Sequence, residues 1–323
     1  MDTGEYLKTA VQPYRIVNDT AQALLRGFSA RLTGFDTAES IFEADLSLPL
    51  GTVDFSIDIR KERGRAREAA EKAAGESGSS AWRNTAALFA LWADSATATH
   101  TKVEDIWLEF DYAASQDRCA DPCVFIDARQ ATRENHLWIY NEPLAALLGE
   151  APSKPLRSSL SGCIGALPQG KGLFQLGVML ARQFTEQRVR VFTDEADARS
   201  LMTYLKRIEA PTCPPEDIFA LMSRWSDGKY IADFDVCEAG VMTKLGINFG
   251  LASYTPPVMS EFLGMLCSGG MAMRESCAPL TEWHNFARDI SHFKLVFDPP
   301  YPVRAKVYLR EWPVDRLSGV ARW

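Results

Sequence analysis

The sequence predicts an α+β protein in which ten antiparallel strands close into a barrel and helices cover its outside. Alternation of polar and apolar residues, typical of a strand with one polar face, recurs in five pairs of segments along the 323 residues. A short connection joins the two segments of each pair, which favours an antiparallel hairpin over a parallel crossover. Longer segments rich in helix-forming residues separate the pairs. A unit of two strands followed by two helices therefore repeats along the chain.

Each predicted hairpin has its own turn signal. In the first, Pro-Leu-Gly separates residues 41–48 from residues 52–60. In the fourth the chain turns at residues 237–240, and in the fifth it turns at Asp-Pro-Pro-Tyr-Pro. The first strand of the third hairpin has a pattern that a helix would also show. The five hairpins occupy residues 41–60, 103–129, 173–194, 229–250 and 292–312.

Most predicted helices begin with Asp, Glu, Ser, Thr or Pro, which the first turn of a helix favours. They cover residues 65–76, 80–95, 141–150, 194–210, 214–226, 256–268 and 279–290. The segment SSLSGCIGALPQGKG, residues 158–172, is expected to be an irregular loop. No linker rich in Gly, Ser and Pro divides the chain, so residues 1–323 are predicted to form a single domain.

Composition excludes several classes of function. A net charge of -7 and a pI near 5.3 argue against general affinity for nucleic acid or anionic membranes. No apolar run approaches the ~20 residues of a transmembrane helix, and the first residues lack the features of a signal peptide. Seven cysteines without framework spacing indicate reduced thiols. We therefore expect a cytoplasmic protein.

A metal site is not predicted. Cys119 and Cys123 form the only close pair of cysteines, and zinc would need two further ligands. The four histidines are dispersed and form no metal-binding motif.

If the ten strands twist and close, their apolar rows face the helices and their polar rows face the lumen. Cations concentrate in the later hairpins and carboxylates in the earlier ones, as an anionic donor and a nucleophilic acceptor would need. An open sheet with one solvated face would show the same alternation. The polar rows are Asp54, Ser56, Asp58 and Arg60; Trp107, Glu109 and Asp111 with Asp127 and Arg129; Arg188, Arg190 and Phe192; Asp233 and Asp235 with Lys244 and Asn248; and Arg304, Lys306, Tyr308 and Arg310.

The number and order of these elements resemble the ABBA fold of soluble aromatic prenyltransferases across nearly the whole chain. The stretch RAKVY, with Arg304, Lys306 and Tyr308, is similar to the Arg-x-Lys-x-Tyr rows that line the diphosphate site of indole prenyltransferases. The stretch RVRVF resembles an incomplete copy of that row. One departure is Gly246 in TKLGINF, where a tyrosine would complete another row.

The resemblance implies transfer of a prenyl group from an allylic diphosphate to an aromatic acceptor, either a small molecule or a peptide side chain. Glu109 would orient the acceptor and act as general base, while Trp107 and Phe192, with Tyr308, would shield the carbocation. The implied diphosphate ligands are Arg188, Arg190, Lys244, Arg304, Lys306 and Tyr308.

Some alternatives stay open at this point. Mg²⁺ could accompany the diphosphate donor, and the oligomeric state is not determined. A different class of function is a non-catalytic protein that binds a peptide or an anionic small molecule on the same barrel or on an open antiparallel sheet.

Overall fold

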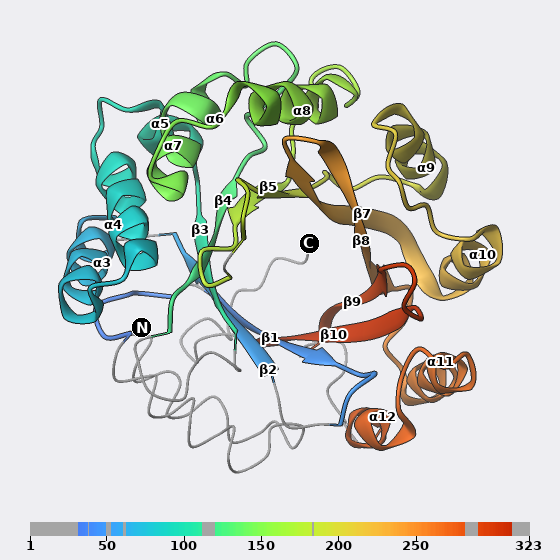
Figure 1. The fold of residues 1–323 in the computed structure, drawn as a ribbon. Helices are drawn as coiled ribbons and strands as arrows, with labels where there is room; N and C mark the ends of the chain where they lie inside the picture. Colours follow the sequence, from blue (N-terminus) through green and yellow to red (C-terminus); the bar gives the residue numbers. More distant parts are fainter. Residues whose placement is uncertain are drawn as a thin grey trace.

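The computed structural model describes residues 32–37, 39–49, 53–60, 63–111, 120–182, 184–281 and 290–311. Within these residues, ten strands form one closed antiparallel barrel, seen along its axis in Figure 1. Each strand pairs with the next one in the sequence, and β1 pairs with β10 to close the ring. The closed barrel expected from the sequence is thus confirmed. The strands are β1 (Glu39–Asp45), β2 (Val53–Ile59), β3 (Ile106–Phe110), β4 (Cys123–Asp127), β5 (Gln175–Val178), β6 (Val189–Phe192), β7 (Ser226–Cys237), β8 (Gly240–Leu251), β9 (Ile290–Phe297) and β10 (Arg304–Glu311).

The turns of the fourth and fifth hairpins lie where the sequence places them, whereas the Pro-Leu-Gly turn of the first falls largely outside the described residues. The β7–β8 hairpin turns between Cys237 and Gly240, and Gly240 has a φ of 114°, which glycine adopts without strain. The segment of the third hairpin that was ambiguous between helix and strand is the strand β5.

Helices surround the barrel on its outside in Figure 1. One prediction was wrong: residues 158–165 are not an irregular loop but belong to α8, whose N-cap Ser153 accepts a hydrogen bond from the Leu156 amide and which begins with proline in its first turn. The helices are α3 (Arg63–Ser77), α4 (Ser80–Ala93), α5 (Ala98–Lys102), α6 (Trp138–Asn141), α7 (Pro143–Leu148), α8 (Lys154–Gly165), α9 (Ala198–Arg207), α10 (Glu216–Trp225), α11 (Pro256–Ser268) and α12 (Arg274–Thr281). The predicted helix at residues 279–290 lies largely outside the described residues.

The main hydrophobic core lies between the barrel and the helices. Trp82 of α4 stacks on Phe110 of β3 with ring centroids 6.3 Å apart. On the other side of the barrel, Phe262 of α11 meets Phe293 of β9 edge to face at 4.8 Å. Burying these apolar faces removes them from water and holds the helices on the sheet. The polar rows of the strands are consequently left facing the lumen.

No helix among the described residues is both long and apolar enough to cross a membrane.

Candidate functional site

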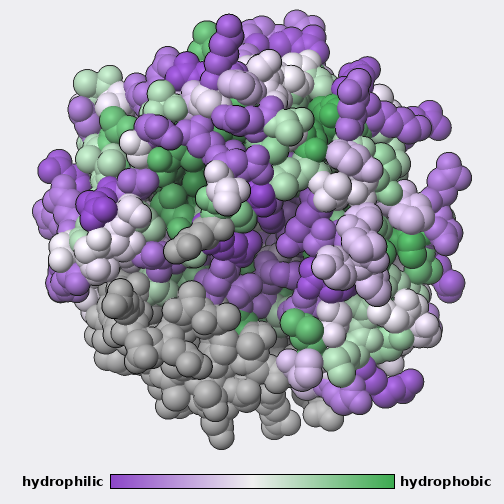
Figure 2. Space-filling model, in the orientation of Figure 1, coloured by the Kyte–Doolittle hydropathy of each residue, from purple (hydrophilic) through white to green (hydrophobic). Residues whose placement is uncertain are grey.

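The lumen of the barrel holds a cavity of about 510 Å³. Figure 2 shows it as a hollow at the centre of the molecule, surrounded by hydrophilic side chains. Every strand of the barrel contributes at least one residue to the lining. The cavity is therefore a product of barrel closure and would be absent from an open sheet.

Most of the predicted site residues meet in this cavity. They are Trp107, Glu109, Arg190, Phe192, Lys244, Lys306 and Tyr308.

Two of the predicted diphosphate ligands do not line the cavity. Arg188 immediately precedes β6 and Arg304 is the first residue of β10, so both lie at one end of the barrel. Arg304 is held by Asp45 at 3.0 Å. Arg188 pairs with Glu186 at 3.3 Å, and its guanidinium covers the ring of Phe184. The alternation correctly predicted the face of each strand but not the depth of each side chain along the barrel axis.

Four cations form one side of the cavity, which we call the basic wall: Arg190, Lys244, Lys294 and Lys306. The guanidinium of Arg190 donates to both oxygens of Asp235, at 2.6 and 3.0 Å. Asp233 accepts from Arg190 at 3.2 Å and from Lys294 at 2.8 Å. Burial acts to raise the pKa of Asp233, but Lys294 and then Arg190 outweigh it and hold that pKa below its ordinary value. Asp233 therefore stays ionised between its two cations.

Lys306 of β10 forms an ion pair with Glu43 of the neighbouring strand β1, and Tyr308 forms a hydrogen bond with the same carboxylate. Burial alone would raise the pKa of Glu43. The charge of Lys306, followed by that of Lys294, reverses this and keeps the pKa well below its usual range. The same pairing raises the pKa of Lys306 against the effect of its burial. Both groups are charged at neutral pH.

Lys244 differs from the other members of the basic wall. Within the described part of the chain it has no hydrogen-bond or ion-pair partner. Burial and the nearby charges of Arg190, Lys306 and Lys294 lower its pKa to about 8. An ammonium surrounded by cations and without a counter-ion is a point of strong positive potential, where an anion would be stabilised.

Aromatic side chains cover another part of the cavity. Phe125 and Phe192 meet edge to face at 5.7 Å, and Trp107 packs against the small cluster that includes Phe125. The ammonium of Lys294 lies 6.0 Å from the ring centres of both Phe192 and Tyr308. These rings therefore present faces that stabilise positive charge.

His292 stacks on Tyr308 with ring centroids 4.1 Å apart. Burial and the charges of Arg310 and Lys294 lower the pKa of His292 to about 3. It is consequently a neutral ring at physiological pH.

Glu109 projects from β3 into the lumen, next to the last residue of the strand. Burial, followed by the negative charge of Glu43, raises its pKa to about 8. Arg182 opposes this shift from 3.4 Å. A carboxyl that ionises near pH 8 inside an aromatic-lined cavity is suited to accept a proton.

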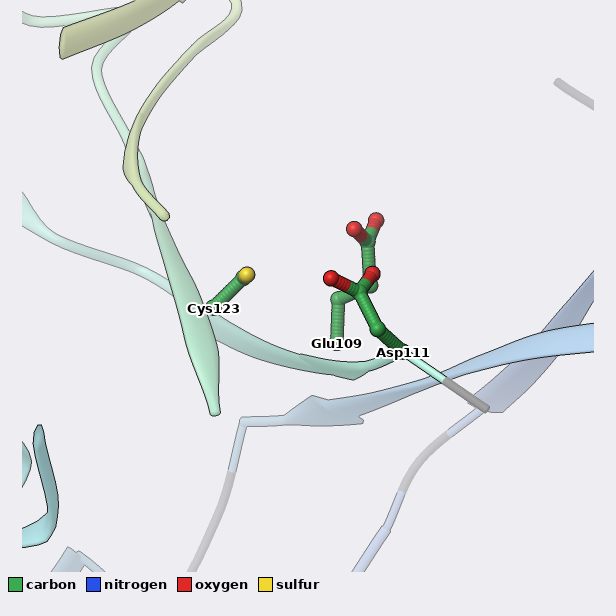
Figure 3. Close-up of side chains that lie close together, drawn as sticks. All are labelled: Glu109, Asp111 and Cys123. Atoms are coloured by element: carbon green, nitrogen blue, oxygen red, sulfur yellow. The ribbon is translucent and has the colours of Figure 1, made fainter. Parts of the chain in front are cut away.

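Glu109, Asp111 and Cys123 place their potential ligand atoms within 4.8 Å of one another. Figure 3 shows the two carboxylates of the β3 side and the thiol of β4 converging on one region. The positive charge in this region comes from Arg182, which donates hydrogen bonds to both carboxylate oxygens of Asp111 at 2.7 and 2.8 Å. The arrangement is an ion-pair cluster with an arginine as its cation.

Several lumen residues were not singled out from the sequence. Glu43 and Lys294 follow the same alternation as the predicted residues, in IFEAD and HFKLV, so that pattern could have identified them. Arg182 lies beyond the end of β5 where no alternation continues, and only the structure brings it to Glu109.

The structure also explains why Gly246 stands where the resemblance favoured a tyrosine. A Cβ at this position would lie 2.2 Å from the Asp233 carboxylate and 2.3 Å from the Lys294 side chain. The Asp233–Lys294 pair occupies the space that a ring would need.

Two solved prenyltransferase structures match this architecture. The prenyltransferase PriB, solved with L-tryptophan and dimethylallyl thiolodiphosphate, matches with a TM-score of 0.58 and 13% identity over 95% of this chain and 94% of PriB. The 5-dimethylallyltryptophan synthase from Streptomyces coelicolor matches with a TM-score of 0.53 and 13% identity over 95% of each chain. No protein-family model matches the sequence, and no curated protein matches it. The chain thus has the ABBA fold of these enzymes, as the order of its elements predicted.

Proposed function

We propose that this protein transfers a prenyl group from an allylic diphosphate to an aromatic acceptor inside the barrel. The observation that carries the proposal is the position of Lys244, an ammonium without a counter-ion among the described residues, within a basic wall beside aromatic side chains and Glu109. This combination suits a reaction in which an anion leaves and a carbocation forms.

The basic wall would hold the diphosphate. Lys244 would bind it directly, and Arg190, Lys306 and Tyr308 would add hydrogen bonds. When the C–O bond breaks, its electron pair leaves with the diphosphate, whose growing charge the same cations stabilise. The allylic cation left behind would face the rings of Phe192, Trp107 and Tyr308, each contributing ~0.5–2 kcal/mol.

The acceptor would lie between these rings and Glu109. Its π electrons attack the allylic cation, which forms the new bond and leaves a proton in excess on the ring system. Glu109 in its ionised form takes up that proton. Because its pKa is raised to about 8, only part of the protein carries the reactive carboxylate at pH 7.

Two measurements test this proposal. Dimethylallyl or geranyl thiodiphosphate should raise the melting temperature by binding the folded state. Incubation with the diphosphates and a panel of aromatic acceptors should give products with the added prenyl mass, and Lys306→Ala should remove turnover while circular dichroism stays unchanged. If no allylic diphosphate stabilises the protein and no prenylated product forms, the proposal is left without support.

The second candidate function is binding of an anionic small molecule without turnover. The carboxylate partners of Arg190, Lys294 and Lys306 favour it, because they already neutralise much of the basic wall. Stabilisation by diphosphates without any product across the acceptor panel would select this candidate.

A further inference from the structure

Arg182, in the loop that follows β5, pairs with Glu109 of β3 and with Asp111 just beyond the end of that strand. Its guanidinium is fixed on Asp111 through two hydrogen bonds of 2.7 and 2.8 Å, the fork geometry in which arginine binds a carboxylate most specifically. The outer nitrogen Nη2 of the same group reaches Oε1 of Glu109 at 3.4 Å. Asp111 therefore determines where the positive charge of Arg182 lies relative to Glu109.

Burial and the negative charges of Glu43, Asp54 and Asp111 all raise the pKa of Glu109 and so oppose its ionisation. Arg182 is the principal cation among the groups that set its charge state. The other titratable side chains that interact with it are Glu43 from β1, Asp54 from β2, Asp111 just beyond the end of β3, Cys123 from β4 and Tyr308 from β10. Cys123 is buried beside the acids and its own pKa is raised, so it adds no charge at neutral pH.

We propose that Arg182 is a positioning residue of the site, which orients the Glu109 carboxyl toward the lumen and determines how readily it gives up its proton. This inference rests on the proposed function, in which Glu109 is the proton acceptor. The role belongs to Arg182 rather than to the basic wall, because Arg182 contacts Glu109 directly.

The direct test measures the titration of Glu109 by infrared difference spectroscopy of its protonated carboxyl between pH 6 and 10. The Glu109→Gln variant identifies the band. We expect Arg182→Met to raise the midpoint by about one pH unit or more, because a neighbouring opposite charge is lost. Arg182→Lys keeps the charge without the fork and should move the midpoint less.

Asp111→Asn supplies an opposite prediction. It removes a negative charge that raises the pKa of Glu109 and leaves Glu109 as the carboxylate paired with Arg182, so the midpoint should fall. A general disturbance of the fold would not move the midpoint in opposite directions in two neighbouring variants. Arg157→Met is the matched control, since Arg157 lies on α8 outside the barrel and donates to the Pro152 carbonyl oxygen.

Activity gives a second readout. If the protein transfers prenyl groups, Arg182→Met should lower the rate at pH 7 about tenfold per unit of pKa shift and regain activity at higher pH. A midpoint of Glu109 that is the same in wild type and Arg182→Met would overturn the inference. Since the titration needs no turnover, a shifted midpoint in a protein that forms no product would contradict the proposed function alone.

Discussion

Lys306 of β10 donates a hydrogen bond to Glu43 of β1, so a residue predicted to bind diphosphate is paired with a carboxylate of the neighbouring strand. Under the proposed function, the diphosphate of the donor would compete with a carboxylate for this ammonium. The balance between the two anions would then determine the affinity for the donor.

Glu43→Gln should strengthen diphosphate binding. The change removes a negative charge beside Lys306 and leaves Lys306 and Tyr308 available to the ligand, so the Kd for dimethylallyl thiodiphosphate should fall about three- to tenfold. Isothermal titration calorimetry measures this, with Glu186→Gln as control because Glu186 pairs with Arg188 outside the cavity. Weaker binding by Glu43→Gln would mean that Glu43 arranges Lys306 for the ligand.

Lys244→Gln should weaken diphosphate binding at least about tenfold, since it removes the member of the basic wall that has no carboxylate partner among the described residues. The affinity of the wild type should also fall as the pH rises from 7 to 9, because the pKa of Lys244 is about 8 and the charged form binds the anion. Binding at pH 8 should take up protons, seen as a dependence of the heat on the buffer. Lys72→Gln is the control, because Lys72 lies on α3 outside the cavity, is exposed and pairs with Glu76. Equal losses in both variants would argue against a special role of Lys244.

Glu109→Gln should reduce the rate of transfer by about 10²–10⁴-fold while donor binding is kept. In the wild type at saturating donor, the rate should rise with pH up to about 8 and then level off, because ionised Glu109 is the reactive form. Rates measured between pH 6 and 9.5 test this. A rate that falls over this range with a saturated donor site would exclude Glu109 as the base.

Asp58 should make the protein less stable as the pH rises. It is 0% exposed, and burial together with Asp105 raises its pKa in the folded state to about 8 from an ordinary value of 3.8. The unfolded chain therefore loses this proton near pH 4, whereas the folded protein keeps it up to about pH 8. The free energy of unfolding should fall by up to ~1.4 kcal/mol per pH unit from this group between the two values.

Asp58→Asn cannot ionise and should remove that part of the slope. Urea unfolding of both proteins at pH 5, 6, 7 and 8 gives the comparison, and the difference in stability should change steadily in favour of the variant. Parallel curves would show that Asp58 ionises normally in the folded state.

Gly246→Ala should destabilise the protein by about 1–3 kcal/mol, because its Cβ would overlap the Asp233–Lys294 pair. Gly264→Ala in α11 is the control, since nothing lies within 4 Å of the Cβ it adds. That change should stabilise by up to ~1 kcal/mol through helix propensity. Thermal unfolding of the two variants decides whether the lack of space at Gly246 matters.

Much of the fold could be predicted because it depends on local patterns. Alternation and short turns are encoded within each hairpin, and Lys306, Tyr308 and Glu109 were assigned to the lumen from their strands alone. The helix α8 was missed because Gly162 and Gly165 lower its helix propensity, while packing of Leu156, Leu160 and Ile164 against the core stabilises it.

The charge state of the site could not be predicted in the same way. It depends on which carboxylate of another strand reaches each cation, as Asp233 does for Arg190 and Lys294. Such partners are distant in sequence and are brought together only by closure and register. The pairing of Arg304 with Asp45 is of the same kind.

The contact between β1 and β10 has a consequence for the order in which the protein matures. A ribosome delivers β10 last among the described strands, and until then the nine earlier strands can form only an open sheet with two unsatisfied edges. That same final strand carries Lys306 and Tyr308. A nascent or prematurely terminated chain is thus both prone to aggregate and devoid of the lumen cavity, so closure of the barrel and formation of the cavity are completed in a single late event.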